Sequence, residues 1–474
     1  MAINPLGPID AAPAASRRLA ELRSTDYARL DQAGHVYLDY TGGGLYGVSQ
    51  VRAHERLLER LVLGNPHSIN PTSRLATELV ERARASVLDF FRAPADEYVA
   101  IFTANASAAL KLVGEAYPFE PGGRLLITVD NHNSVNGIRE FARSRGATLR
   151  YLSGAGPAGR VAEDRLLAEL DQPAGAGARL FGFPAQSNFT GTQHPLHWID
   201  LAHERGWDVV ADCAAFAPTN RLDLSRWHAD FVPLSFYKMF GYPTGVGCLI
   251  ARRSALARLR RPWFAGGTVW AVTVRGDRHF MAGGEAAFED GTVNYTMVPA
   301  VEIGLAHLAR IGMETIHEHV TDLTGRLLAE LCLLRHADGA PLIELYGEAS
   351  TEMRGPTISF NVLDPDGRIV DERIVEQLAT DARISLRTGC FCNPGAAEVA
   401  FGLDRDRLAP GFASRDPLSY DEYVRILGLQ SAGAVRVSLG LVSNERDVRR
   451  LLTFLETFRD RRHDTAGLGP RHHC

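Results

Sequence analysis

The stretch DFVPLSFYKMFGYPTGVG, at residues 230–247, places Lys238 just after a short apolar run and within an aromatic segment. Short apolar runs flanked by Gly, Pro or Asp are typical of buried strands. Amphipathic stretches such as HPLHWIDLAHERG separate this run from others of its kind. The alternation predicts an α/β domain around a mainly parallel sheet. The other runs are YVAIFTA (98–104), RLLITVD (124–130), ARLFGFPA (178–185), WDVVADCA (207–214) and GVGCLIA (245–251).

After about residue 295 the pattern changes to a long helical stretch at residues 298–335. Strand-like TISFNVLD, a helix through DERIVEQLATD, strand-like AVRVSLG and the helix NERDVRRLLTFLETFRDRR follow it. This order predicts a second, smaller α+β domain. We expect an N-terminal segment (1–30), a large domain (31–300) and a small C-terminal domain (301–474).

Composition favours a globular protein with a small-molecule partner. The 474 residues are 45% hydrophobic and 23% charged, with a formal net charge of −5. No run of like charges suggests a nucleic-acid or membrane surface, and no window is long and apolar enough for a membrane helix. The N-terminus lacks the pattern of a signal peptide, so we expect a cytoplasmic location. Six scattered cysteines do not form a disulfide framework, which fits a reducing compartment.

Four residues that follow apolar runs are candidates for a ligand site, because ligands of open α/β sheets gather where strands end. Ser107 follows YVAIFTA at the start of a helix, where an anion such as phosphate is favoured. His132 follows RLLITVD, where an imidazole can stack on a planar ligand or move protons. Asp212 ends an apolar run and needs a cationic partner if buried. Lys238, in apolar surroundings, is expected to have a lowered pKa and to favour imine chemistry.

Each of these residues also has an ordinary structural interpretation. The serine and the aspartate can cap helices, and the histidine can be a solvated loop residue. Together, however, an anion site, a stackable ring, a carboxylate and an apolar lysine describe a site for pyridoxal 5'-phosphate. That cofactor needs its phosphate anchored, its pyridinium nitrogen paired with a carboxylate and its aldehyde carried on a lysine.

The segment LRTGCFCNPGAA, at residues 386–397, contains two cysteines one residue apart, Cys390 and Cys392. No second cysteine pair or histidine pair follows at ligand spacing, so a zinc site is not expected and we predict no metal. Both cysteines can be small buried hydrophobes, the commonest fate of a free cysteine. Glycine and proline on both sides instead predict a turn.

Several motifs resemble the class V aminotransferase-fold cysteine desulfurases, and most closely the N-terminal desulfurase domain of molybdenum cofactor sulfurases. The resemblance covers nearly the whole chain and implies the fold type I of pyridoxal-phosphate-dependent transferases, which is aspartate aminotransferase-like. The motifs are YLDYTGGG, GNPHS, FTANASAALKLV, DNHNSVNGIRE, FPAQSNFTG, DFVPLSFYKMFGYPTGVG, FEDGTVNY, GPTISFNVLD, LRTGCFCNPGA and VRVSLG.

The resemblance implies that Lys238 is the Schiff-base lysine, that Asp212 pairs with the pyridinium nitrogen and that His132 stacks on the ring and takes part in catalysis. The other positions that it places at the cofactor are Asn188 beside the ring oxygen, Ser107 and Ser235 at the phosphate, and Ala106 and Tyr237 next to these groups.

Three further roles are implied. Thr292, in FEDGT, matches a threonine that reaches the phosphate of the neighbouring subunit, which implies a homodimer. Arg436 matches the arginine that binds the substrate α-carboxylate. Cys392 matches the cysteine that attacks the substrate sulfur, on a loop that its Gly and Pro neighbours would allow to swing into the site. The implied reaction converts L-cysteine to L-alanine and leaves a persulfide on Cys392, while Cys390 has either a sulfur-accepting or a packing role.

Some positions depart from the family pattern. Ala106 replaces a hydroxyl residue, Ala215 replaces a glutamine of simpler desulfurases, Tyr237 replaces a histidine, and Ala397 replaces a third cysteine. The chain stops soon after the helix near residue 460, so we expect a separate sulfur acceptor, either a molybdenum cofactor protein or a pathway to a sulfur-containing metabolite. The alternatives are an aminotransferase, racemase or lyase acting on another amino acid, for which no thiol is needed, and a non-catalytic scaffold.

Overall fold

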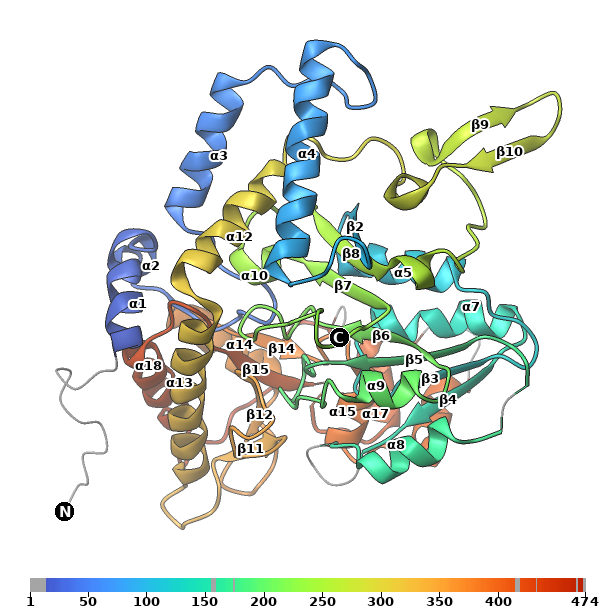
Figure 1. Cartoon of the computed structure of the whole chain (residues 1–474). Coiled ribbons are helices and arrows are strands. Elements are labelled where there is room, and N and C mark those ends of the chain that lie inside the picture. Colours follow the sequence, from blue (N-terminus) through green and yellow to red (C-terminus); the bar gives the residue numbers. More distant parts are fainter. Residues whose placement is uncertain are drawn as a thin grey trace.

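The computed structural model describes residues 14–154, 159–173, 175–413, 418–431, 433–465 and 468–471. A seven-stranded sheet with strand order β2-β8-β7-β6-β5-β3-β4 forms its largest layer (Figure 1). Strand β8 alone is antiparallel to its neighbours, so the expected mainly parallel sheet is confirmed. The strands are β2 (Tyr98–Thr103), β3 (Arg124–Thr128), β4 (Thr148–Leu152), β5 (Arg179–Pro184), β6 (Asp208–Asp212), β7 (Phe231–Ser235) and β8 (Gly247–Arg252).

The apolar runs of these strands are continuous because both faces of the sheet are covered. Every residue of β3 and of β7 is buried. Helices α5 (Ala106–Ala116) and α7 (Ile138–Ser144) pack on one face, and α8 (Glu163–Leu170) and α9 (Trp198–His203) contribute to the core on the other. The carboxyl ends of the parallel strands therefore meet at one edge, where the candidate site residues follow them.

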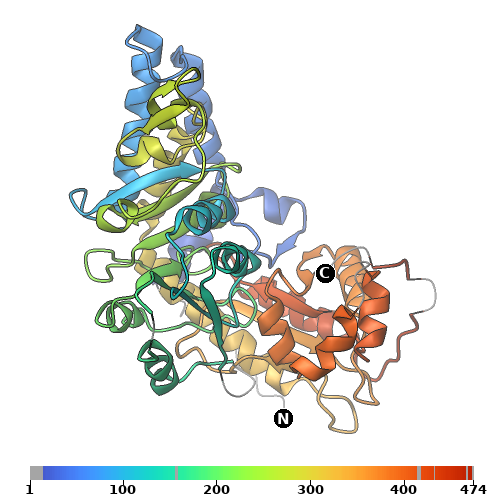
Figure 2. The ribbon, with the colours of Figure 1, turned by 90° about the vertical axis from the view of Figure 1, so that its right-hand side faces the viewer.

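A second, antiparallel sheet has the order β11-β12-β15-β14. Helices α13 (Met313–Leu333), α14 (Glu372–Asp381) and α18 (Glu445–Glu456) pack around it. Figure 2 shows this orange and red part of the chain beside the green part that carries the large sheet. The strands are β11 (Ile343–Tyr346), β12 (Thr357–Val362), β14 (Arg387–Gly389) and β15 (Ala434–Ser438).

Further strands and helices complete the described chain. Two further strand pairs are β1 (Val36–Tyr37) with β13 (Ile384–Ser385), and β9 (Val269–Thr273) with β10 (Arg278–Met281). The remaining helices are α2 (Arg29–Gln32), α3 (Val48–Arg60), α4 (Pro71–Phe90), α6 (Asn133–Asn136), α10 (Phe236–Phe240), α11 (Arg253–Leu256), α12 (Pro299–Ile311), α15 (Pro394–Ala400), α16 (Arg405–Leu408) and α17 (Tyr420–Ile426), with short 3-10 turns η2 (Gly266–Thr268), η3 (Gly284–Ala287) and η4 (Ala409–Phe412).

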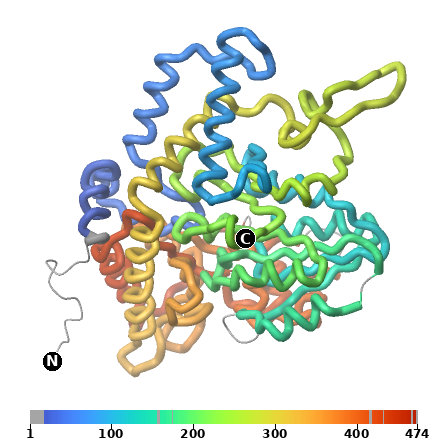
Figure 3. Tube along the Cα trace, in the orientation of Figure 1, coloured from blue at the N-terminus to red at the C-terminus, as the bar shows by residue number. Residues whose placement is uncertain are grey.

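The N-terminal part of the described chain packs on its C-terminal part. Helix α1 (Ala14–Thr25) lies beside α18, as the blue and red tubes of Figure 3 show. Arg23 of α1 donates to Asp447 of α18 at 3.0 Å, and both side chains are buried. Strand β1 pairs in parallel with β13. These contacts bring the YLDY motif, which starts at the last residue of β1, to the second sheet, where Asp39 bridges to Ser438.

The hairpin β9–β10 projects from the body of the molecule, on the same side as α3 and α4 (Figure 1). Its side chains Trp270, Val272 and Phe280 are exposed, and Trp270 stacks on Phe280. Exposed apolar groups on a projecting arm favour contact with another surface. No helix of the described residues combines the length and the apolarity that crossing a membrane requires.

Candidate active site

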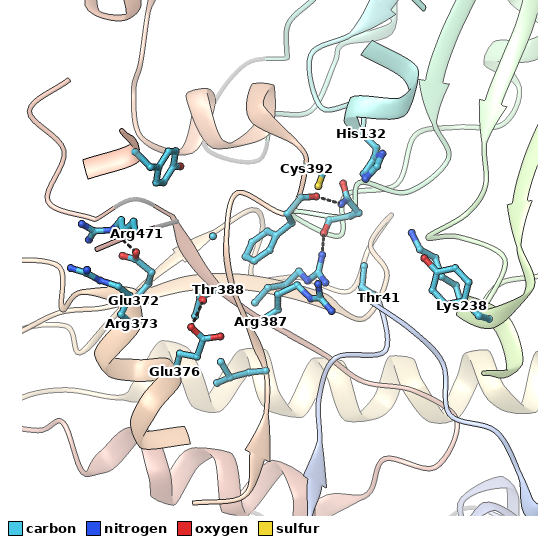
Figure 4. Close-up of a pocket in the computed structure, with 18 of the residues that line it drawn as sticks. Thr41, His132, Lys238, Glu372, Arg373, Glu376, Arg387, Thr388, Cys392 and Arg471 are labelled. Atoms are coloured by element: carbon cyan, nitrogen blue, oxygen red, sulfur yellow. Dashed lines mark hydrogen bonds and ion pairs between the residues drawn. The ribbon is translucent and has the colours of Figure 1, made fainter. Parts of the chain in front are cut away.

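A cavity of about 550 Å³ lies between the strand ends of the large sheet and the second sheet. Lys238, His132 and Asn188 line it from the first side, and Cys392 and Arg436 line it from the second. Figure 4 shows Lys238 and His132 toward one end of this cavity, Arg471, Glu372 and Arg373 toward the other, and Cys392 and Arg387 between them. The fold thus brings together residues that are more than 300 positions apart in the sequence, such as His132 and Arg471.

Lys238 lies on the short helix α10, which starts directly after β7. The helix ends at Gly241, whose φ of 77° is a left-handed conformation that favours glycine. A Cβ on Gly44 would lie 2.8 Å from the Lys238 carbonyl oxygen, so the glycines of YTGGG permit this close approach. Burial lowers the pKa of Lys238, Asp212 opposes this effect, and Arg436 adds to it. The amine forms no hydrogen bond or ion pair with the described residues and is available for chemistry.

Asp212 is the last residue of β6 and is buried. Its Oδ1 accepts a hydrogen bond from the Ala214 amide at 3.0 Å, while Oδ2 has no hydrogen-bond partner in the described chain. No helix of the described chain starts directly after Asp212, so it does not cap one, and its contact within the following turn accounts for only one of the two oxygens. The second oxygen can accept from a cationic N–H group.

His132 caps the short helix α6 through Nδ1, which accepts from the Ser134 amide at 3.1 Å. It is therefore not a solvated loop histidine, and its Nε2 has no partner among the described residues. Burial lowers the pKa of His132 to about 4, Lys238 and Arg436 act in the same direction, and Asp212 opposes them. The imidazole is consequently neutral near pH 7, which suits contact with a planar aromatic ligand.

The three positions expected at the phosphate lie together at the first turn of α5. Asn105 caps this helix, so Ser107 is not its N-cap. The Ala106 amide donates to the Ser235 hydroxyl at 2.9 Å, and the hydroxyl oxygens of Ser107 and Ser134 lie 2.6 Å apart. Hydroxyls and amides at the start of an eleven-residue helix form a donor set suited to a phosphate. Ser134 was not predicted, although DNHNS contains it.

Cys392 lies in a tight turn between β14 and α15, and its thiol is exposed and free. Phe391 and Cys392 have φ angles of 56° and 54°, in the left-handed region. The Cys392 carbonyl accepts from the Asn133 amide at 2.7 Å, and Asn188 donates to the Phe391 carbonyl at 2.8 Å. The turn is therefore anchored with its thiol already at the cavity, instead of projecting as a long loop.

Arg436, on β15, is buried and held on two sides. It donates to Asp39 at 3.0 Å and to the Asn188 carbonyl at 3.0 Å, and its guanidinium lies 4.5 Å from the centre of the Phe391 ring. Its Nε is buried without a hydrogen-bond partner in the described chain. Burial lowers the pKa of Arg436 and Asp39 opposes this effect. The orientation of Arg436 is fixed by the protein, and its side chain lines the cavity as a positively charged group that suits an anion.

The sequence reasoning did not assign two charged residues of this region. Asp39 accepts from both Arg436 and Arg387, and Arg387 lines the cavity. Both residues belong to motifs that were singled out in the sequence, Asp39 to YLDY and Arg387 to LRTGC. The pairing needed a parallel contact between chain segments about 350 residues apart, which periodicity does not predict.

Arg471 was also missed, and it lines the opposite end of the cavity. Its guanidinium donates to Asp371 at 2.6 Å, to Glu372 at 3.0 Å and to Asp421 at 2.7 Å. Arg373 donates to the Gly469 carbonyl. The end of the polar tail is thus held by these bonds, and Pro470 and Arg471 line the cavity.

The remaining predicted positions lie as follows. Tyr237 lines the cavity next to Lys238. Thr292 does not: it lines a separate cavity of about 340 Å³ together with Thr103 and Lys111, so one chain does not bring it to Lys238. Among the other cysteines, Cys213 and Cys248 are buried with raised pKa values, Cys332 is an exposed free thiol, and Cys390 takes part in a disulfide instead of being reduced. Cys474 lies outside the described residues.

Comparison with known proteins assigns the chain to a family. Residues 36–451 match the family model described as aminotransferase class-V, and the chain belongs to this family. It is 36% identical over 479 residues to a molybdenum cofactor sulfurase of Solanum lycopersicum, covering 93% of this chain and 57% of that protein. It is 37% identical over 459 residues to that of Bos taurus, covering 92% and 51%. The chain thus spans little more than half the length of these relatives.

Solved structures agree on the fold. A cysteine desulfurase from Thermococcus onnurineus superposes with a TM-score of 0.75 at 24% identity, covering 92% of this chain and 97% of that one. A cysteine desulfurase from Escherichia coli gives 0.72 at 21%, covering 93% and 98%. A cystine C–S lyase gives 0.66 at 20%, covering 90% and 98%. The expected fold type I architecture is confirmed.

Proposed function

We propose that this chain is a pyridoxal-phosphate-dependent cysteine desulfurase, which converts L-cysteine to L-alanine and leaves the sulfur as a persulfide on Cys392. The observation that carries this proposal is the free Cys392 thiol in the same cavity as the lysine Lys238. Reactions of this fold at an amino-acid Cα need the lysine, but only sulfur transfer needs the thiol.

The described residues suit the cofactor. Lys238 would hold its aldehyde carbon, the free Oδ2 of Asp212 would accept from its ring nitrogen, and His132 would lie against its ring. Ser107 and Ser235, with the Ala106 amide, would hold its phosphate, and Asn188 would reach its ring oxygen. When bound, the cofactor supplies an electron sink for the carbanion formed at the substrate Cα.

Arg436 is the binding group for the substrate α-carboxylate. Its guanidinium is fixed by Asp39 and by the Asn188 carbonyl, so little side-chain entropy remains to be lost on binding. The adjacent Arg387 adds positive charge and is partly exposed. The two arginines exceed the single carboxylate of Asp39, which leaves a net positive charge for the anionic end of an amino acid.

Lys238 and Cys392 would carry the chemical steps. The lowered pKa of Lys238 favours the neutral amine, which can take a proton from Cα and return it. The Cys392 thiolate attacks the substrate sulfur, and a new S–S bond forms as the C–S bond breaks. The electron pair of the broken bond stays with the substrate β-carbon, which takes up a proton to become the methyl group of alanine.

The persulfide would pass to a separate acceptor. The relatives described above are named molybdenum cofactor sulfurases. This similarity supports the proposal that the acceptor is molybdenum cofactor or a protein that holds it. A pathway to a sulfur-containing metabolite is the other candidate. We also propose a homodimer, supported by the position of Thr292 away from Lys238 and by the exposed aromatic residues of the β9–β10 hairpin.

We retain two further proposals from the sequence. The chain would divide into an N-terminal segment (1–30), a large domain (31–300) and a small domain (301–474), which is supported by the start of α12 at Pro299. We propose a cytoplasmic location on the basis of the sequence; four cysteines of the described chain are free thiols, whereas the disulfide of Cys390 does not support a reducing compartment.

The test is release of alanine from L-cysteine by purified, cofactor-loaded protein with a reductant present. We expect turnover by the wild type and a loss of at least about a hundredfold in Cys392→Ser, because the hydroxyl is a far weaker nucleophile. The variant should keep the cofactor absorption band. Equal turnover by both proteins would reject sulfur transfer through Cys392 and favour a lyase, whereas a bound cofactor without alanine from either protein would direct the search to transamination or racemisation of other amino acids.

A further inference from the structure

Asn393 follows the reactive cysteine and is completely buried. Its side-chain Nδ2 donates to the Asp130 carbonyl at 2.7 Å and to Asn188 Oδ1 at 2.9 Å. Its Oδ1 accepts from the Ala396 amide at 3.1 Å, which caps helix α15. Both halves of this one amide are used, on three different segments of the chain.

These bonds surround a turn that is unfavourable by itself. Left-handed φ angles at two successive non-glycine residues, Phe391 and Cys392, are energetically unfavourable for residues with a Cβ atom. The Cys392 thiol forms no hydrogen bond with the described residues, so its position depends on where the backbone of the turn is held. The turn therefore needs external bonds to keep the thiol at the cavity.

We propose that Asn393 is the positioning residue for Cys392, and that it couples the cysteine turn to Asn188 at the wall of the cofactor site. The effect of Asn393 on catalysis rests on the proposed function. The role of Asn393 in holding the cysteine turn does not depend on that function. Asn393 fixes the turn to the end of β3 through Asp130 and to the cavity wall through Asn188. The Asn188 amide itself donates to Phe391, so the contact between the turn and the cofactor wall runs in both directions.

The chemistry of the site specifies asparagine. The carbonyl of Asp130 and Oδ1 of Asn188 are both acceptors, so the side chain between them must donate twice. Aspartate would cap α15 equally well but would place a carboxylate against two oxygens. Serine would keep a capping hydroxyl while being too short to bridge the two acceptors. Asn393→Asp and Asn393→Ser thus separate the capping role from the positioning role.

The chain supplies its own controls for a thiol-reactivity experiment. Cys332 is exposed on α13 and does not line the cavity, while Cys213 and Cys248 are buried in the core. Alkylation of each cysteine by iodoacetamide, followed by mass spectrometry, reports on local and global exposure in one sample. Full-length, cofactor-loaded protein without substrate is used, so the readout does not require turnover.

We expect Cys392 alkylation to become at least about threefold faster in Asn393→Ser and Asn393→Asp, with Cys332 unchanged and Cys213 and Cys248 still protected. In the desulfurase assay kcat should fall about tenfold or more with KM within about threefold, because misplacing a reacting atom by 1 Å can cost about a hundredfold in rate. The proposal is overturned if Cys392 alkylation and kcat match the wild type, or if Cys213 and Cys248 react together with Cys392, which would assign Asn393 to global folding. A wild type that makes no alanine would reject the proposed function, while the alkylation comparison would still decide the role of Asn393.

Discussion

The two ends of the cavity differ in how their charged groups are paired. At one end Lys238 has no ion-pair partner in the described chain, one oxygen of Asp212 is free, and Nε2 of His132 accepts or donates nothing. Burial lowers the pKa values of both the lysine and the histidine. Buried polar groups without partners are costly to stability, so their presence together marks a site built for a ligand.

At the other end the same cavity is lined by Arg471, whose guanidinium is bonded to Asp371, Glu372 and Asp421 (Figure 4). Paired charges of this kind hold a chain segment in place without offering a free group for chemistry. The comparison teaches that lining a cavity does not by itself identify a catalytic residue. The two ends differ in how many of their polar groups have no hydrogen-bond or ion-pair partner within the described chain.

Removing the lysine should break this comparison most strongly. We expect Lys238→Ala to lower turnover of L-cysteine by about a thousandfold or more, because no other described amine lies at the cavity to carry the cofactor. The free energy of unfolding of the Lys238→Ala variant should not fall, because the variant removes a buried amine whose charged form is unfavourable in the interior. Kinetics and chemical denaturation of the same preparations measure both effects. Residual activity above one tenth of wild type would contradict the assignment of Lys238.

Removing Arg471, whose charge is paired, should lower the free energy of unfolding and leave turnover nearly unchanged. Arg471→Ala leaves three carboxylates close together, two of them buried, so we expect a loss of about 3 kcal/mol in the free energy of unfolding. Turnover should change by less than about threefold, since no group of Arg471 is free to act. Arg462→Ala, which breaks an exposed pair with Asp366, is the matched control and should leave stability unchanged. A large loss of turnover without a loss of stability would move Arg471 into the catalytic machinery.

Local sequence was sufficient to predict the first end of the cavity and insufficient for the second. Asp212, His132 and Lys238 each end or follow an apolar run, and parallel strands bring such ends to one edge. The glycine and proline content of residues 386–397 was enough to predict a turn in that segment. The anchoring of that turn was not predictable, because it depends on bonds from Asn393 to segments about 200 and 260 residues away.

The ion pairs of Arg471 and of Arg436 were equally hidden. Each joins segments that are distant in the sequence and meet only in the folded chain, 397 residues apart for Arg436 and Asp39 and 50–100 residues apart for Arg471 and its partners. Charge alone did not distinguish Arg471 from the many other arginines of the polar C-terminal region. The family resemblance placed Arg436 at the site, but its partner Asp39 comes from the opposite end of the chain. Long-range pairing of this kind depends on the tertiary fold instead of local propensity.

The smallest expected effect concerns pH and sharpens the comparison at the unpaired end. The pKa of His132 is lowered to about 4, against an ordinary value of about 6.5 in an unfolded chain. Between these two values the unfolded state binds more protons than the folded state, so stability rises with pH across this window and is lost as pH falls. We expect His132 to account for about 1–2 kcal/mol of the stability lost between pH 7 and pH 5.

His132→Gln removes the titrating group while keeping a side chain able to form hydrogen bonds. The variant should therefore lose less stability than wild type between pH 7 and pH 5, as measured by denaturant unfolding at each pH. His279→Gln, on the exposed strand β10, should follow the wild-type dependence. The groups that face His132 are Lys238, Asp212 and Arg436, of which the first and third disfavour its protonation. If His132→Gln and wild type lose stability equally, the imidazole is not held neutral by its surroundings, and the contrast between the two ends of the cavity then rests on Lys238 and Asp212 alone.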